Sequence, residues 1–142
     1  MGAKIVDHGM KEIQRNIKIM AKATVKVGLI GGKADGHVIA YAGYNEFGTK
    51  HIPSRPFMRN TFDQDSAKME KRIASAYVAV QNGSSVSSEL TKTGLFYQGL
   101  IQKMIGSNIG PANKPKTIAR KGSSKTLIDN GRMRQSISFE VK

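Results

Sequence analysis

The residues closest to a phosphate-binding motif are Gly32 and Lys33, which follow a β-branched run. A Walker-type loop needs a glycine five residues before this Gly-Lys pair, and a Ser or Thr after the lysine to reach Mg²⁺. The chain has Val27 and Ala34 at these two places. Both required groups are missing, so we interpret residues 31–36 as a hairpin turn or short loop and not as a nucleotide site.

Metal-ligating and catalytic side chains are few and scattered. The histidines His8, His37 and His51 have no ligand spacing, and a metal site would need carboxylates from distant segments. Asp63 and Asp65 fall near the start of a predicted helix, where they favour its dipole. The sequence has no cysteine and no Gly-x-Ser-x-Gly elbow. We therefore expect no metal, no cofactor and no enzymatic activity.

Basic side chains, in contrast, are clustered in residues 106–126. This segment contains no acid and carries five cations: Lys114, Lys116, Arg120, Lys121 and Lys125. Clustered cations can neutralise phosphates. Single-strand binding also needs interleaved aromatic rings, and none occurs between Tyr97 and Phe139. Non-specific duplex contact, docking on an acidic protein rim and a merely solvated loop all remain open.

Aromatic residues gather on both sides of a loop that contains Pro53 and Pro56. They are Tyr41, Tyr44, Phe47, Phe57 and Phe62. They can form a core cluster that holds the loop. An exposed Phe47 or Phe57 would instead be an anchor for a partner. The sequence leaves both interpretations open.

The whole chain shares the basic bias. Its 142 residues include 23 basic and 10 acidic groups, a net charge of +13. Residues 111–142 hold 8 basic and 2 acidic groups, or +6. This imbalance predicts an anionic partner, such as nucleic acid, a membrane surface or an acidic protein. The length indicates one domain, residues 1–142, with one core. No apolar run approaches the roughly 20 residues of a membrane span.

The helices and strands expected along the chain must position these residues, and together they indicate an α+β domain. Helices are expected over about residues 8–22, 57–81 and 88–105, and strands over 24–31, 37–44 and 137–141. Val38, Tyr41 and Tyr44 also fit a short helix. Residues 106–126 are expected to form a flexible basic loop. The expected order is α-β-β-α-α-loop-β, with a small, mostly antiparallel sheet packed by two to three helices.

Local signals mark the ends of these elements. Asp7 is a candidate N-cap for the first helix, and Ser87 or Ser88 for the helix after residue 84. Gly83 suits the left-handed position that ends the long helix. Asp129-Asn130-Gly131 indicates a turn before the last strand.

Two segments together resemble a known family. Residues Tyr44-Asn-Glu-Phe-Gly-Thr-Lys-His-Ile-Pro-Ser-Arg-Pro-Phe-Met-Arg59 are similar to the "Asn-Glu-Phe-Gly-Thr … Ile-Pro-Ala-Arg-Pro-Phe" stretch of small tail and neck components of tailed bacteriophages. Residues 117–122 and 126–141 resemble the family's closing "Thr-Ile-x-Arg-Lys … Pro-Leu-Ile-Asp-Thr-Gly-x-Leu-x-x-Ser-Ile". The chain departs from it at Thr126, Asn130 and Met133, where Pro, Thr and Leu are usual. The matching positions cover about a quarter of the chain.

The resemblance implies a virion morphogenesis protein of a tailed phage or prophage. It would act in tail completion or head–tail joining at the neck, as a homo-oligomeric ring that could be hexameric. Its expected partners are other neck and tail proteins, with non-specific DNA contact left open and no membrane. It would be found in the virion, at the neck or tail top, and in the host bacterial cytoplasm during assembly. The alternative is a small basic nucleic-acid-binding protein.

The candidate assembly interface combines the basic residues with residues of the proline loop. It comprises Phe47, Arg55, Phe57, Lys114, Lys116, Arg120, Lys121, Lys125, Arg132 and Arg134. Phe57 is expected to be largely buried, in its own subunit or against a neighbour. Residues 106–126 are expected to be poorly ordered in an isolated subunit, because few apolar groups offset the backbone entropy. Arg120 and Lys121 are expected to act in assembly and not in folding.

Overall fold

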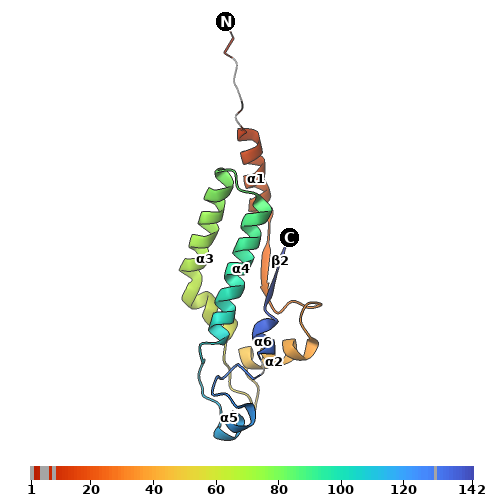
Figure 1. The fold of residues 1–142 in the computed structure, drawn as a ribbon, viewed down its shortest axis with the longest axis vertical. Coiled ribbons are helices and arrows are strands. Elements are labelled where there is room, and N and C mark those ends of the chain that lie inside the picture. The colour runs from red at the N-terminus through yellow and green to blue at the C-terminus, as the bar shows by residue number, and fades with distance from the viewer. Residues whose placement is uncertain (1, 4–6, 8, 130) are drawn as a thin grey trace.

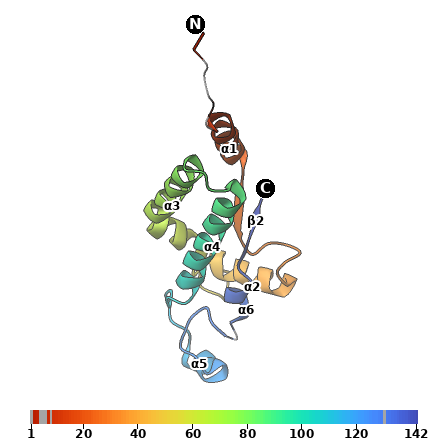
Figure 2. The ribbon, with the colours of Figure 1, turned by 45° about the horizontal axis from the view of Figure 1, so that its top comes forward.

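The computed structural model describes residues 2–3, 7, 9–129 and 131–142. Helices and a small sheet build an elongated molecule, with α1 near one end and α5 at the other (Figures 1 and 2). In chain order the elements are α1 (Met10–Lys22), β1 (Val25–Gly28), α2 (Gly36–Phe47), α3 (Phe57–Gln81), α4 (Val86–Ile105), α5 (Pro115–Lys121), α6 (Arg132–Gln135) and β2 (Ser138–Val141). The α+β class and the small antiparallel sheet are confirmed.

The two long helices α3 and α4 form an antiparallel pair at the centre of the molecule (Figure 1). α3 has the predicted bounds, and Gly83 after it has a φ of 96°, the left-handed conformation expected there. α4 begins at Val86, two residues earlier than predicted. Its cap is Ser85 and not Ser87 or Ser88, because the Ser85 hydroxyl accepts a hydrogen bond from the Ser88 N–H.

The sheet pairs the strand that follows α1 with the strand near the C-terminus, and it packs on α4. β1 and β2 pair antiparallel, with Val27 opposite Phe139. The Phe139 ring lies against Gly94 of α4, where a Cβ would be 2.3 Å from a ring carbon. Glycine at this position therefore allows the sheet to approach the helix.

The predicted second strand at 37–44 was wrong, because this segment lies within helix α2. Asp35 caps the helix, with its carboxylate accepting from the His37 N–H at 2.8 Å. Val38 and Ala42, four residues apart, are the apolar side chains that α2 buries, which is helical spacing. Residues 29–35 therefore form the predicted short loop, with a turn at Gly32 and Lys33, but it connects β1 to α2 and not two strands of a hairpin. The expected order α-β-β-α-α-loop-β changes accordingly.

Buried apolar residues form two clusters, where the sequence predicted one core. The smaller cluster lies between α1, α3 and α4: Met20, Ala76, Val80 and Leu90. The larger lies at the other end of α3 and α4: Val38, Ala42, Phe57, Ile101, Met104, Ile105, Leu127, Met133 and Ile137. Because the pair of α3 and α4 is elongated, different segments of the chain pack against its two ends, and each end has its own cluster of buried apolar residues. The larger cluster holds together the two segments that resemble the phage family.

Residues 106–126 contain the short helix α5, which the sequence analysis did not predict. Pro115 occupies its first turn, and Gly122, with a φ of 67°, ends it. No residue of α5 is buried. The poor order expected for this segment in solution stays a prediction.

The local signals at the two chain ends have different outcomes. The N-cap of α1 is Gly9 and not the predicted Asp7, although the Asp7 carboxylate does accept a hydrogen bond from the Met10 N–H at 2.7 Å. The C-terminal part of the chain contains the short helix α6, which the sequence analysis did not predict, followed by β2. Asn130, part of the predicted turn, and His8 lie outside the described residues.

Candidate functional site

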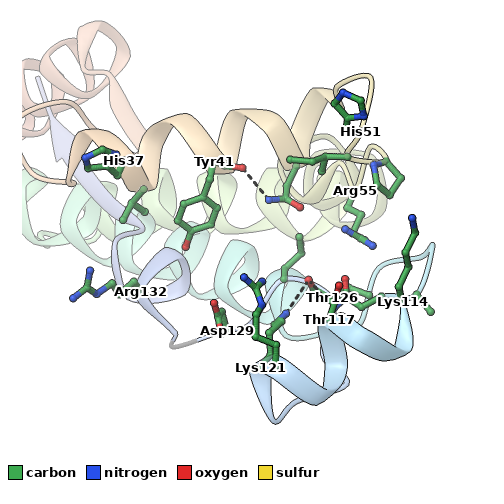
Figure 3. A pocket seen from close by; sticks show the side chains of 18 of the residues that line it. His37, Tyr41, His51, Arg55, Lys114, Thr117, Lys121, Thr126, Asp129 and Arg132 are labelled. Atoms are coloured by element: carbon green, nitrogen blue, oxygen red, sulfur yellow. Dashed lines mark hydrogen bonds between the residues drawn. The ribbon is translucent and has the colours of Figure 1, made fainter.

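The two segments that carry the family resemblance face each other across an open cleft of about 740 Å³ (Figure 3). α2 and residues 51–55 line one side. α5 and residues 112–114 line the other, together with Thr126, Leu127, Asp129 and Arg132. The larger apolar cluster supports both sides from beneath, through Val38 of α2 and Leu127. The cleft therefore depends on contacts between residues far apart in the sequence.

The cleft is basic. Five of the predicted interface residues line it: Arg55, Lys114, Arg120, Lys121 and Arg132. Two carboxylates, those of Asp35 and Asp129, also line it. Five cations against two carboxylates leave a formal charge of +3. We therefore expect the cleft to attract anionic groups.

Arg55 is the most deeply placed of these cations. It is only 6% exposed, although it lies in the proline loop. Its Nε donates a hydrogen bond to the Pro111 carbonyl at 2.8 Å, which ties this loop to the segment before α5. No acidic side chain pairs with Arg55 within the part of the chain that the structure describes. Burial lowers the pKa of its guanidinium.

Lys121 lies on the opposite side and is half-buried. Its Nζ donates to the Lys125 carbonyl at 3.0 Å and, at 3.4 Å, to that of Thr126 (Figure 3). Burial is the main cause that lowers the pKa of Lys121, and the positive charges of Arg55 and Arg120 lower it further against the effect of Asp129. Lys121 thus contributes to the local fold as well as to the charge of the cleft.

Thr126 adds a polar group without a partner. Its hydroxyl is buried at the cleft and has no hydrogen bond within the described residues. Its backbone N–H is satisfied, since it donates to the Asn108 side-chain oxygen at 3.1 Å. A buried hydroxyl without a partner is unfavourable for stability.

The motif residue Glu46 has a structural role that the sequence analysis missed. Its carboxylate is buried and accepts hydrogen bonds from the backbone N–H groups of Met58 at 2.9 Å and Arg59 at 3.1 Å. These are first-turn donors of α3, whose N-cap, Pro56, provides no side-chain acceptor. The Arg59 side chain also pairs with this carboxylate at 3.0 Å. A cap more than ten residues away in sequence leaves no local signal.

The two phenylalanines of the motif have different environments. Phe57 is 1% exposed and belongs to the larger apolar cluster, so its predicted burial is confirmed and occurs within the chain itself. Phe47 is 76% exposed at the end of α2, and the Arg59 guanidinium carbon lies 5.5 Å from its ring centre. Of the two, Phe47 is the one available to a partner.

The other predicted interface residues do not line the cleft. Lys116, Lys125 and Arg134 are exposed elsewhere on the surface. The Lys125 ammonium donates to the Gly106 carbonyl at 3.2 Å and so closes the base of the 106–126 segment. A role of these three residues in assembly stays a prediction.

The histidines of the cleft are not part of a metal-binding cluster. His37 and His51 both line the cleft (Figure 3), but no group of three or more His, Cys, Asp or Glu able to hold a metal occurs among the described residues.

Lys33, of the Gly-Lys pair, donates its Nζ to the Phe139 carbonyl at 2.9 Å. None of the helices in the described ranges is long and apolar enough to cross a membrane.

Comparison of the chain with protein-family models, curated proteins and solved structures finds no match. The two motif-like segments and the geometry of the cleft between them therefore carry the functional interpretation.

Proposed function

We propose that this protein is a structural subunit of a tailed phage or prophage virion, acting in tail completion or head–tail joining at the neck as part of a homo-oligomeric ring. The observation that carries the proposal is the position of the two family-like segments. They are separated by most of α3 and α4, yet they line one cleft. Segments that resemble one family and converge on one surface behave as a single functional unit.

The exposed surface gives independent support for a role in an assembly. The chain exposes 9384 Å². A compact monomer of 15.5 kDa would expose about 7,200 Å². Large apolar side chains on this surface include Met10, Ile19, Tyr44, Phe47, Phe62, Ile73, Val78 and Leu95. An extended shape with exposed apolar groups suits a subunit that buries its surface against neighbours.

The alternative, a small basic nucleic-acid-binding protein, draws on the net charge of +13. The two proposals differ in salt dependence. A specific nucleic-acid binder keeps sequence-dependent affinity beyond the electrostatic part, whereas non-specific contact disappears steeply as salt rises. Titration of duplex DNA at several salt concentrations therefore separates them.

The decisive experiment is deletion of the gene from the phage or prophage that encodes the chain. Electron microscopy should then show DNA-filled heads and separate tails, and a plasmid-borne copy should restore joined particles. Mass spectrometry of purified virions should detect the protein. Normal joined particles without the gene would contradict the proposal.

A further inference from the structure

We propose that Arg55, together with Lys121, forms a recessed subsite that binds a carboxylate group of a peptide segment. On the proposed function, which this assignment of the partner rests on, the segment belongs to a neighbouring virion protein. The binding chemistry itself follows from the residues of the cleft.

Arg55 has hydrogen-bonding capacity that the fold leaves unused. A guanidinium has five N–H donors in a planar fork. The Pro111 carbonyl takes the Nε–H, and the terminal nitrogens have no acceptor among the residues that the structure describes. A side chain as buried as this one normally pairs its charge. Its fork therefore has donors left for a ligand that enters the cleft.

Like charges gather around Lys121. The positive charges of Arg55 and Arg120 both lower the pKa of Lys121, so each of them lies close enough to repel its ammonium. The carboxylate of Asp129 acts in the opposite direction and raises this pKa. Folding thus brings cations together at a point where burial already disfavours them. An anion bound between them would relieve this repulsion.

The recessed geometry favours a carboxylate on a peptide over a DNA phosphate. Arg55 lies inside a cleft and is 6% exposed, so a convex duplex meets the outer cations before it can reach the guanidinium. A single acidic side chain or chain terminus is narrow enough to enter. The planar fork of arginine matches the two oxygens of a carboxylate. The exposed Lys114 and Arg120 would add attraction at longer range.

The test uses the full chain and short fluorescent peptides in fluorescence anisotropy at physiological salt. The main probe is an acetylated and amidated peptide with two glutamates, and its counterpart carries glutamines instead. A neutral peptide with a free C-terminal carboxylate distinguishes a chain terminus from a side chain as the source. Inorganic phosphate and a short DNA duplex serve as competitors.

Two matched variants separate the subsite from general charge. Arg55→Lys keeps the positive charge but removes the planar fork of donors. It should lower the affinity of the chain for the carboxylate peptide about tenfold or more. Arg134→Lys makes the same change outside the cleft and should leave the affinity within about twofold of the original chain. Equal affinities of the two variants, binding of the glutamine peptide, or displacement by phosphate or DNA at lower concentration than by the carboxylate peptide would overturn the proposal.

Circular dichroism would show whether Arg55→Lys folds. If it does not, a second pair of variants tests the proposal. Arg120→Gln removes an exposed cation at the cleft, and Arg134→Gln removes one elsewhere. The first should weaken peptide binding about threefold relative to the second. Equal binding by this pair would count against the subsite.

The phage experiment keeps the two proposals apart. A folded Arg55→Lys variant that has lost peptide binding should also fail to restore joined particles. Full rescue by that variant would refute a neighbouring virion protein as the partner, while the need for the gene in joining would stand. Conversely, joined particles without the gene would refute the proposed function and leave the peptide measurements as the test of carboxylate binding.

Discussion

Glu46 shows how one motif residue can fix the start of a helix from a distant point in the chain. Each of its two oxygens accepts from a different backbone N–H, those of Met58 and Arg59. The carboxylate is buried, so water cannot replace it. Its negative charge also lies at the positive end of α3. The angle between α2 and α3, and with it one side of the cleft, depends on this group.

Replacing Glu46 by glutamine should therefore destabilise the fold. Glutamine has one acceptor oxygen, so one of the two N–H groups would face an amide NH₂ and lose its partner. We expect Glu46→Gln to lower the free energy of unfolding by about 2 kcal/mol, measured from urea denaturation midpoints. Glu70→Gln makes the same change at an exposed position of α3 and should stay within about 0.5 kcal/mol of the original chain. Similar midpoints for both variants would contradict the capping role.

At the scale of elements, the contact of α4 with the sheet depends on the missing side chain of Gly94. A Cβ there would lie 2.3 Å from the Phe139 ring, so helix and strand would have to separate. We expect Gly94→Ala to cost about 2 kcal/mol of unfolding free energy, as overpacked cores do. Gly99, on the same helix, has open space where a Cβ would lie, so Gly99→Ala should instead gain about 0.5–1 kcal/mol. Thermal unfolding followed by circular dichroism would compare the two, and a shift of the same sign in both would argue against this packing.

The pairing of α3 with α4 should depend on pH through Glu89. This buried carboxylate accepts from the Lys92 ammonium at 2.8 Å and from the Arg72 guanidinium at 2.6 Å. The hydrogen bond from Lys92 is the largest cause that lowers the pKa of Glu89; burial opposes it, and Arg72 lowers it further. A lowered folded-state pKa means that the contribution to stability is present above the unfolded value of about 4.3 and is lost as the pH falls through the folded pKa.

We therefore expect the melting temperature of the original chain to fall more steeply between about pH 5 and pH 3 than that of Glu89→Gln. The measurement is a series of thermal melts across this pH range. Glu12→Gln, at an exposed position of α1, should keep the slope of the original chain. Parallel pH profiles for Glu89→Gln and the original chain would show that Glu89 does not cause the loss of stability at low pH.

The sequence predicted elements whose signals are local, and missed those that depend on distant contacts. α3 has the predicted bounds because a proline before Phe57 and Asn82-Gly83 mark its ends within the chain. α2 was misread because Val38, Tyr41 and Tyr44 fit two periodicities, and a cap at Asp35 decided between them. In the cleft, the clustered cations were visible in the sequence. The burial of Arg55 was not, because the Pro111 carbonyl and the opposite side of the cleft come from another part of the chain.

At the scale of the whole molecule, the elongated shape gives the chain two distinct ends. The smaller apolar cluster and α1 lie at one end, and the basic cleft with α5 lies toward the other (Figure 1). Exposed cations near the cleft, such as Arg120 and Lys114, have no hydrogen bond or ion pair from their side chains to other described residues. They are therefore free of structural roles that Lys121 and Arg55 do have. This makes them suitable for separating assembly from folding.

We expect Arg120→Ala with Lys114→Ala to leave the melting temperature within about 2 °C of the original chain, since exposed cations outside packed networks contribute little to stability. The same variant should fail to restore head–tail joining in a phage that lacks the gene, because removing cations from a charged docking face slows encounter and lowers complementarity. Lys11→Ala with Lys18→Ala removes the same charge from α1, at the other end of the molecule, and should restore joining. Rescue by the cleft variant to the level of the α1 variant would show that the cations of the cleft take no part in assembly. A large drop in its melting temperature would assign them to the fold instead.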